Sequence, residues 1–358
     1  MNENRATRYN RLKRRASVLS LALTGLFLCG LLATGLSVRL REAVGSAGIY
    51  VIVLAVTHEL LTLPLSVYSG LLLERRYDLS GISISDWFLD RLKAFALGLL
   101  LSVLAAAVVG WSARTAGELW WVAAASAFSL AGIVLAAVAP LLFLPIFYRF
   151  KPLDRPALTA RLLALANNEG VPAVGVFEWG LGAKTSKANA ALVGLGSTRR
   201  IILADTLLDN YTDDEIEVIV AHELGHHVHR DMMKAIGFES ALVFAGAFAA
   251  DLLFRAIAPG LGIRDVTDPA GLPLLVIGAG AVSVLLAPLA NALSRRAERR
   301  ADLFALTLTK RPDSFMSAMR RLGAQNLAEE HPSRLVQALF HSHPPIPERL
   351  AAARALTD

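Results

Sequence analysis

The run His-Glu-Leu-Gly-His at residues 222–226 carries the residue types of a zinc-dependent hydrolase. His222 and His226 are four residues apart, which places both imidazoles on one face of an α-helix. Two imidazoles in this arrangement can bind one zinc ion, and Glu223 lies beside them, where a carboxylate can take a proton from an activated water molecule. We therefore predict one Zn²⁺ ion per chain, with Glu223 as the catalytic base.

The residues before this motif predict the helix that carries it. Thr212 and Glu215 have the spacing of a capping box, so a helix should begin there. Ile216, Ile219 and Val220 then form an apolar stripe at helical spacing. The motif is thus expected on a well-defined helix with one buried face, and not on an isolated polar surface helix.

A third ligand is needed, because catalytic zinc commonly has three protein ligands and one open position. His227 points off the ligand face and His229 lies two turns beyond His222. We therefore expect each to be solvated or to contact a ligand side chain without binding the metal. The best candidate further along the chain is Glu298. Asp302, four residues later on the same helix face, could hydrogen-bond a ligating imidazole. Read from the residues alone, Glu298 could equally belong to a charged surface helix with Glu–Arg pairs.

The composition indicates a membrane protein. Of the 358 residues, 54% are hydrophobic and only 18% are charged, whereas ordinary soluble domains are about a quarter charged. The net charge of +6 could suit nucleic acid, but in an apolar chain it more commonly reflects Lys and Arg that flank membrane spans. We expect a lipid bilayer and a protein or peptide substrate as partners, and no nucleic acid. The single cysteine, Cys29, excludes an intramolecular disulfide and a thiolate metal cluster.

Six apolar segments approach or reach the length of about 20 residues that a membrane helix needs. They are Ala16–Val38, Ala47–Leu73, Ala94–Trp111, Leu119–Tyr148, Ala235–Leu253 and Leu272–Leu293. The first is expected to be a retained anchor, since it is too long for a signal peptide and lacks a convincing cleavage site. Lys and Arg gather before the first segment, between the second and third, and after the fourth. The positive-inside rule therefore predicts a multi-pass protein with both termini and the zinc part in the cytoplasm.

The predicted fold is mainly α: a multi-span transmembrane helical bundle with a small α+β zinc-peptidase domain. Residues 1–150 would hold four spans, and residues 151–233 a short sheet and the zinc helix. Residues 234–293 would form a two-span hairpin, which returns the chain to the side that it left. Residues 294–358 would be a helical part that supplies the third ligand, Glu298.

Four separated blocks resemble the integral-membrane gluzincin family of type I CAAX prenyl endopeptidases. They are residues 63–77, residues 186–208, the zinc helix, and residues 298–302 with 342–350. The family's eukaryotic members have seven spans and longer insertions, so the resemblance implies the chemistry more than the substrate. The heat-shock membrane proteases share the zinc elements, but their usual four spans fit less well.

The resemblance also implies roles for individual residues. Glu298 would be the third zinc ligand, and Asn189 and Ala190 would lie beside the substrate on an edge strand. Strand addition suits a peptidase, because main-chain hydrogen bonds do not depend on sequence. His343 would stabilise the oxyanion, and Arg349 would hold its loop or the intermediate. From the residues alone, the block around residue 189 predicts only a β-hairpin, with residues 174–179 and 200–203 as neighbours.

Polar groups inside the second segment leave other functions open. His58 and Glu59 either line a water-filled chamber or form a buried structural pair together with Asp251. They would also suit a transporter, which gives no reason for the zinc motif. A non-catalytic zinc-stabilised membrane scaffold is the other rival class. Within the enzyme class, a general quality-control protease for membrane proteins competes with an enzyme that processes membrane-associated or C-terminally modified proteins.

Overall fold

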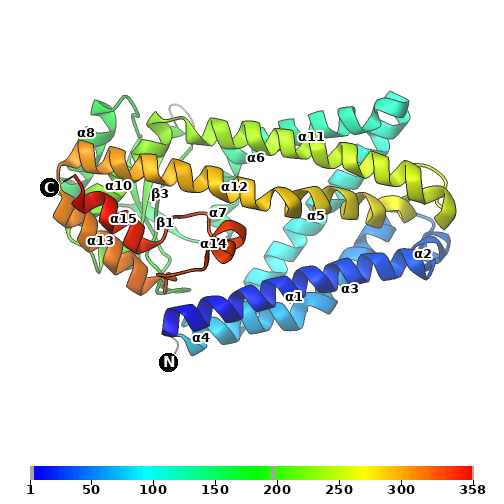
Figure 1. Ribbon diagram of the computed structural model, residues 1–358, viewed down its shortest axis with the longest axis horizontal. Coiled ribbons are helices and arrows are strands. Elements are labelled where there is room, and N and C mark those ends of the chain that lie inside the picture. Colours follow the sequence, from blue (N-terminus) through cyan, green and yellow to red (C-terminus); the bar gives the residue numbers. More distant parts are fainter. Residues whose placement is uncertain (1–3, 195–197, 357–358) are drawn as a thin grey trace.

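The computed structural model describes residues 4–194 and 198–356. Long helices form one end of the molecule, and a smaller part with a sheet and short helices forms the other (Figure 1). The long helices are α1 (Arg5–Ala33), α3 (Ala47–Val67), α5 (Ile84–Ala116), α6 (Trp120–Leu142), α11 (Asp231–Ile257) and α12 (Leu272–Thr309). This arrangement confirms the predicted fold class.

Short elements connect the long helices. They are α2 (Leu36–Val44), the π-helix η1 (Tyr68–Leu72), α4 (Leu73–Arg76), the 3₁₀ turn η2 (Gly117–Leu119), α7 (Leu144–Phe147), and the 3₁₀ turns η4 (Ala258–Leu261) and η5 (Pro269–Gly271). The first predicted segment ran past the observed end of α1, because Gly35 adopts a left-handed φ of 68° and turns the chain into α2.

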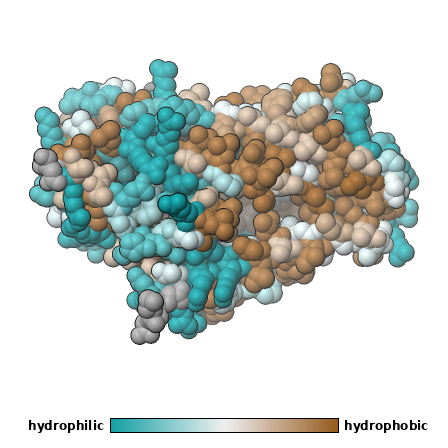
Figure 2. Space-filling model, viewed as in Figure 1, coloured by the Kyte–Doolittle hydropathy of each residue, from teal (hydrophilic) through white to brown (hydrophobic). Residues whose placement is uncertain are grey.

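The surface of the long helices is apolar. Figure 2 shows a broad hydrophobic area over them and a mostly hydrophilic surface at the opposite end. Leu26 is 72% exposed and Leu285 is 76% exposed, which suits contact with lipid and not with water. Among the described residues, five stretches of helix are long and apolar enough to cross a membrane. The sequence predicted six segments. The numbers differ because one of the five stretches, Ile84–Ala139, contains both α5 and most of α6, which pack against each other.

The polar groups predicted in the second segment have separate partners. The ring of His58 is 2.9 Å from the hydroxyl of Thr24, and Glu59 accepts two hydrogen bonds from Arg91. Asp251 accepts hydrogen bonds from the indole of Trp120 and from Arg255 instead. The suggested pairing with Asp251 is therefore wrong.

A four-stranded sheet has the order β1-β2-β4-β3. Its strands are β1 (Phe150–Pro152), β2 (Val176–Trp179), β3 (Ala190–Val193) and β4 (Arg200–Ala204). β3 pairs antiparallel with β4, as the predicted hairpin requires, and β2 pairs parallel with β4. β2 is therefore not a neighbour of β3, and β3 is an edge strand.

Helices enclose the sheet and complete this end of the molecule. They are α8 (Pro156–Asn168), α9 (Asp205–Leu208), α10 (Asp213–Val228), α13 (Pro312–Gln325), α14 (Arg334–Phe340) and α15 (Ile346–Arg354). Leu162 of α8, Leu203 of β4, Ile216 of α10 and Phe315 of α13 are fully buried in one common core. This core fixes α10 against the sheet.

α12 joins the two ends of the molecule. It has 38 residues, so it is about 57 Å long at 1.5 Å per residue. It runs without a break through residues 293 and 294, where the sequence prediction divided two parts. Gly278 lets α12 approach α11 closely, since a Cβ there would lie 2.7 Å from the Cα of Ala250. One rigid element thus carries both an apolar segment and Glu298.

Candidate metal centre

α10 is fixed at its start and along one face. Thr212 accepts a hydrogen bond from the backbone N–H of Glu215, whose side chain accepts one from the N–H of Thr212. This is the predicted capping box, which satisfies two of the free N–H groups at the helix start. Ile216 and Val220 of the predicted stripe are buried, so rotation of α10 about its axis would expose its apolar face.

Gly225, inside the His-Glu-Leu-Gly-His run, sets the distance between α10 and α12. A Cβ at this position would lie 3.1 Å from the Cα of Ala301 and from the ring of Phe304. Any larger residue would therefore push the two helices apart. The close approach brings Glu298 of α12 to the histidines of α10.

Three side chains meet at this contact. His222, His226 and Glu298 each place one potential ligand atom within 4.8 Å of the others. Nε2 of His222 is 3.3 Å from Oε2 of Glu298, and Nε2 of His226 is 3.4 Å from Oε1. Oε2 is also a buried oxygen without a hydrogen-bond partner among the described residues. Two imidazoles and one such carboxylate are a donor set that fits a divalent metal ion.

Carboxylates hold the other nitrogen of each imidazole. Nδ1 of His222 is 2.9 Å from Asp302, and Nδ1 of His226 is 3.2 Å from Asp231. Asp302 in turn accepts two hydrogen bonds from Arg349, at 2.8 and 2.5 Å. Because each Nδ1 faces a carboxylate, both Nε2 atoms are directed toward Glu298, which is the usual support of a metal-ligating histidine.

Asp231 was missed in the sequence. It is the first residue of α11, directly after Arg230, whose φ of 54° turns the chain between α10 and α11. A short break after the motif followed by an acidic residue at a helix start is the one local signal that points to it. Arg300 donates to the same carboxylate at 2.6 Å.

Charge and burial shift two groups in this cluster. Burial alone would lower the pKa of His222, but the carboxylates of Asp302 and Glu298 raise it to about 9. Burial raises the pKa of Glu223 above its ordinary value, because the charged carboxylate is poorly solvated there. In the metal-free cluster, His222 therefore holds a proton at neutral pH that a metal ion would displace.

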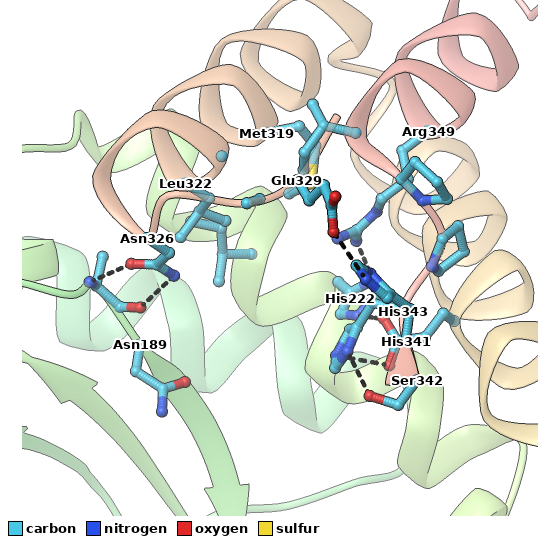
Figure 3. Close-up of a pocket in the computed structure, with 18 of the residues that line it drawn as sticks. Asn189, His222, Met319, Leu322, Asn326, Glu329, His341, Ser342, His343 and Arg349 are labelled. Carbon is cyan, nitrogen blue, oxygen red and sulfur yellow. Dashed lines mark hydrogen bonds and ion pairs between the residues drawn. The ribbon is translucent and has the colours of Figure 1, made fainter. Parts of the chain in front are cut away.

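A cavity of about 630 Å³ opens over the cluster. Its wall includes Glu223 and residues from distant parts of the chain, among them Arg14 of α1, Met319 of α13 and residues 340–346, which run from the end of α14 to the start of α15. In Figure 3, Asn189 and Asn326 lie on one side of the cavity, and His222, His341, His343 and Arg349 lie on the other.

The remaining predicted residues also lie at this cavity. Ala190 lines it from the start of β3, and the exposed Asn189 lines it from the position directly before β3. Nε2 of His343 is 3.3 Å from Oε1 of Glu298, and its side chain is 63% exposed. His227 and His229 lie outside the cluster, since their rings face the carbonyl oxygens of Leu192 and Gly225.

Comparison with known proteins places this geometry in a family. Residues 152–357 match the family model described as Peptidase family M48, and residues 3–149 match "CAAX prenyl protease N-terminal, five membrane helices". The uncharacterized metalloprotease YhfN of Bacillus subtilis is 29% identical, over 88% of this chain and 74% of its own length. CAAX prenyl protease 1 of Saccharomyces cerevisiae is 26% identical, over 82% of this chain and 68% of its own length.

A solved structure has the same fold. The crystal structure of Ste24p from S. mikatae superposes with a TM-score of 0.87 at 20% identity, covering 97% of this chain and 88% of that one. These matches do not favour the transporter or scaffold alternatives, and they confirm the resemblance seen in the sequence. The chain belongs to peptidase family M48, and it is a membrane metalloprotease.

Proposed function

We propose that this protein is a zinc endopeptidase that cleaves membrane-associated or C-terminally modified proteins near the cytoplasmic bilayer surface. The observation that carries the proposal is the shared cavity: the cluster of His222, His226 and Glu298, the base Glu223 and the edge strand β3 all face it. The names of relatives, CAAX prenyl proteases, support this substrate class.

The roles of the residues follow from their positions. Zinc held by His222, His226 and Glu298 would polarise the scissile carbonyl and lower the pKa of a water molecule. Glu223 takes the proton of the attacking water and returns it to the leaving nitrogen. Its raised pKa suits this return, because a weaker acid keeps the proton until the amine needs it.

The other residues position the substrate and the ligands. Asp302 and Asp231 orient the two imidazoles, and Arg349 holds Asp302. His343, next to Glu298 and open to the cavity, donates a hydrogen bond to the carbonyl oxygen as negative charge develops on it. The substrate backbone adds to the free edge of β3 near Asn189 and Ala190.

The place of the cavity supports a substrate at the membrane. Asn10 and Arg14 of α1 line it, and the same helix continues into the apolar part of the molecule. A polypeptide tethered to the bilayer therefore reaches the cavity without leaving the surface. The positively charged segments beside the spans support a cytoplasmic location of both termini and of the cavity.

Glu223→Gln tests the function. Purified protein should keep its zinc and lose about 10²–10⁴-fold in peptidase activity, because the general base is removed. Glu217→Gln is a matched control on the same helix, since Glu217 pairs with Arg161 and Arg311. Full activity of Glu223→Gln would contradict the mechanism.

The substrate class needs a second measurement. Membrane peptides that accumulate with Glu223→Gln but not with active enzyme can be identified by mass spectrometry. A small set of proteins with related C-terminal regions is expected. A broad set of misfolded membrane proteins would instead favour general quality control.

A further inference from the structure

The register of β3 determines which of its backbone groups face the cavity. The N–H of Ala204 in β4 donates to the carbonyl oxygen of Asn189 at 3.0 Å. In an antiparallel pair, residues that face the partner alternate with residues that face away. The N–H and C=O of Ala188, Ala190 and Leu192 therefore point to the outer edge, where a substrate strand would add.

Asn326 already occupies one end of this edge. Its Oδ1 accepts a hydrogen bond from the N–H of Ala188 at 3.0 Å, and its Nδ2 donates to the C=O of Ala188 at 3.2 Å (Figure 3). One side-chain amide thus imitates the backbone of a neighbouring strand. Asn326 is held in place, because Asn10 of α1 donates to the next carbonyl, that of Leu327, at 2.7 Å.

His227 occupies the other end. Its Nε2 is 3.0 Å from the C=O of Leu192, and since a carbonyl only accepts, Nε2 carries the donated proton. His227 directly follows His226, so the contact also fixes β3 relative to the metal cluster. Ala190, between the two covered residues, has neither backbone group bound on its outer side by a residue that the structure describes.

We infer that Asn326 and His227 are positioning residues that limit the substrate-binding edge of β3 to the stretch between them. The inference rests on the proposed addition of substrate to this edge. With the C=O groups of Ala188 and Leu192 both taken, only the C=O of Ala190 can accept an N–H from the substrate. This holds for either direction of the substrate strand, so the enzyme fixes the register of the peptide through one backbone acceptor, the C=O of Ala190.

A scan of N-methylated peptides tests this on the unaltered enzyme. A cleaved peptide is made in a series with one backbone N–H methylated at a time, and kcat/KM is measured for each. One position along the edge should lose about 2- to 10-fold, the value of one hydrogen bond. Positions two residues to either side should show no such loss.

Substitution of either positioning residue should add a peptide position at which N-methylation lowers kcat/KM. Asn326→Ala frees the C=O of Ala188, so a second sensitive position should appear two residues from the first. His227→Ala frees the C=O of Leu192, and its new position should appear on the opposite side. Gln325→Ala is the matched control: it frees the C=O of Ser186 and the hydroxyl of Tyr211 but leaves Ala188 covered, so the pattern should stay unchanged.

The outcomes separate this inference from the proposed function. Two or three sensitive positions, spaced by two residues, in the unaltered enzyme would overturn the limit while leaving edge addition intact. An active enzyme without a sensitive position would overturn edge addition, and the limit with it. A merely structural role of Asn326 would lower kcat/KM for all peptides equally and add no position. The scan on the unaltered enzyme decides the question even if a variant does not fold.

Discussion

The cavity is lined by two groups of residues that are held in different ways, which we call the ligand side and the loop side. On the side of the ligands, each imidazole contacts a carboxylate, and Asp302, the more buried of the two carboxylates, is bound twice by Arg349. On the loop side, residues 341–345 are held through Arg295, which donates to the carbonyl oxygens of Gln337 and His341. His343 itself is mostly exposed and contacts Ser342 and Glu298.

This difference suits the two tasks of these residues, which are binding a metal ion and contacting the substrate. Ligands must be in place before a metal ion binds, and paired buried charges keep their geometry at little further cost in entropy. A group that meets the substrate can settle when the substrate arrives, because catalytic hydrogen bonds often tighten only in the complex. We therefore expect changes on the ligand side to affect metal content, and changes on the loop side to affect turnover.

Glu298→Gln should have the largest effect. It removes the negative charge that the two imidazoles face, so the metal content should fall to a small fraction of one ion per chain. Activity should fall on the order of 10³-fold or more, because the activated nucleophile is lost. Elemental analysis of the purified protein measures the first result and peptide cleavage the second. Glu329→Gln, an equally buried carboxylate of the same cavity that pairs with Arg14 and His341, should keep the metal.

His343→Ala should separate the two sides. Loss of an oxyanion donor lowers kcat by about 10²–10³-fold, while the metal content should not change. His341→Ala, in the same loop but paired with Glu329, serves as the control for loop damage. Loss of metal in His343→Ala would instead make His343 part of the ligand side.

The ligand side could largely be predicted from the sequence, because its signals are local or follow from topology. The spacing of His222 and His226 and the capping box are visible within one helix. Glu298 came within reach once the two apolar segments before it were recognised as a hairpin. The observed cluster adds one reason that was not recognised: Gly225 permits the close contact with α12.

The remaining contacts depend on distant parts of the chain. Asn326 binds Ala188 across 138 residues, and nothing near either residue indicates the other. Asp231 reaches His226 only because Arg230 takes a left-handed conformation that its residue type does not favour. The edge position of β3 was implied by the family resemblance, whereas the residues alone predicted only a hairpin.

Asp302→Asn and Asp231→Asn should show which of the two carboxylates that contact the imidazoles contributes more to metal affinity. Loss of such a partner typically costs 10- to 100-fold in metal affinity. Asp302 should lie near the upper end, because it is buried and lies closer to its imidazole, and because its substitution leaves the buried Arg349 without its carboxylate partner. Asp231 should lie near the lower end, since His226 is more exposed. Competition with a chelator of known affinity gives both values, and equal losses would contradict the ranking.

The pH dependence should differ in sign with and without metal. The pKa of His222 is raised from 6.5 to about 9 in the folded metal-free protein, so its proton stabilises the fold fully below about pH 6.5 and this stability is lost as the pH rises through about 9. Metal must displace that proton, so metal affinity should rise over the same range by up to about tenfold per pH unit. Thermal unfolding in detergent at pH 6.5 and 9, with and without zinc, measures both trends. Metal-free protein that gains stability toward pH 9 would contradict the raised pKa, and Asp302→Asn should weaken both trends because it removes a carboxylate that holds the proton.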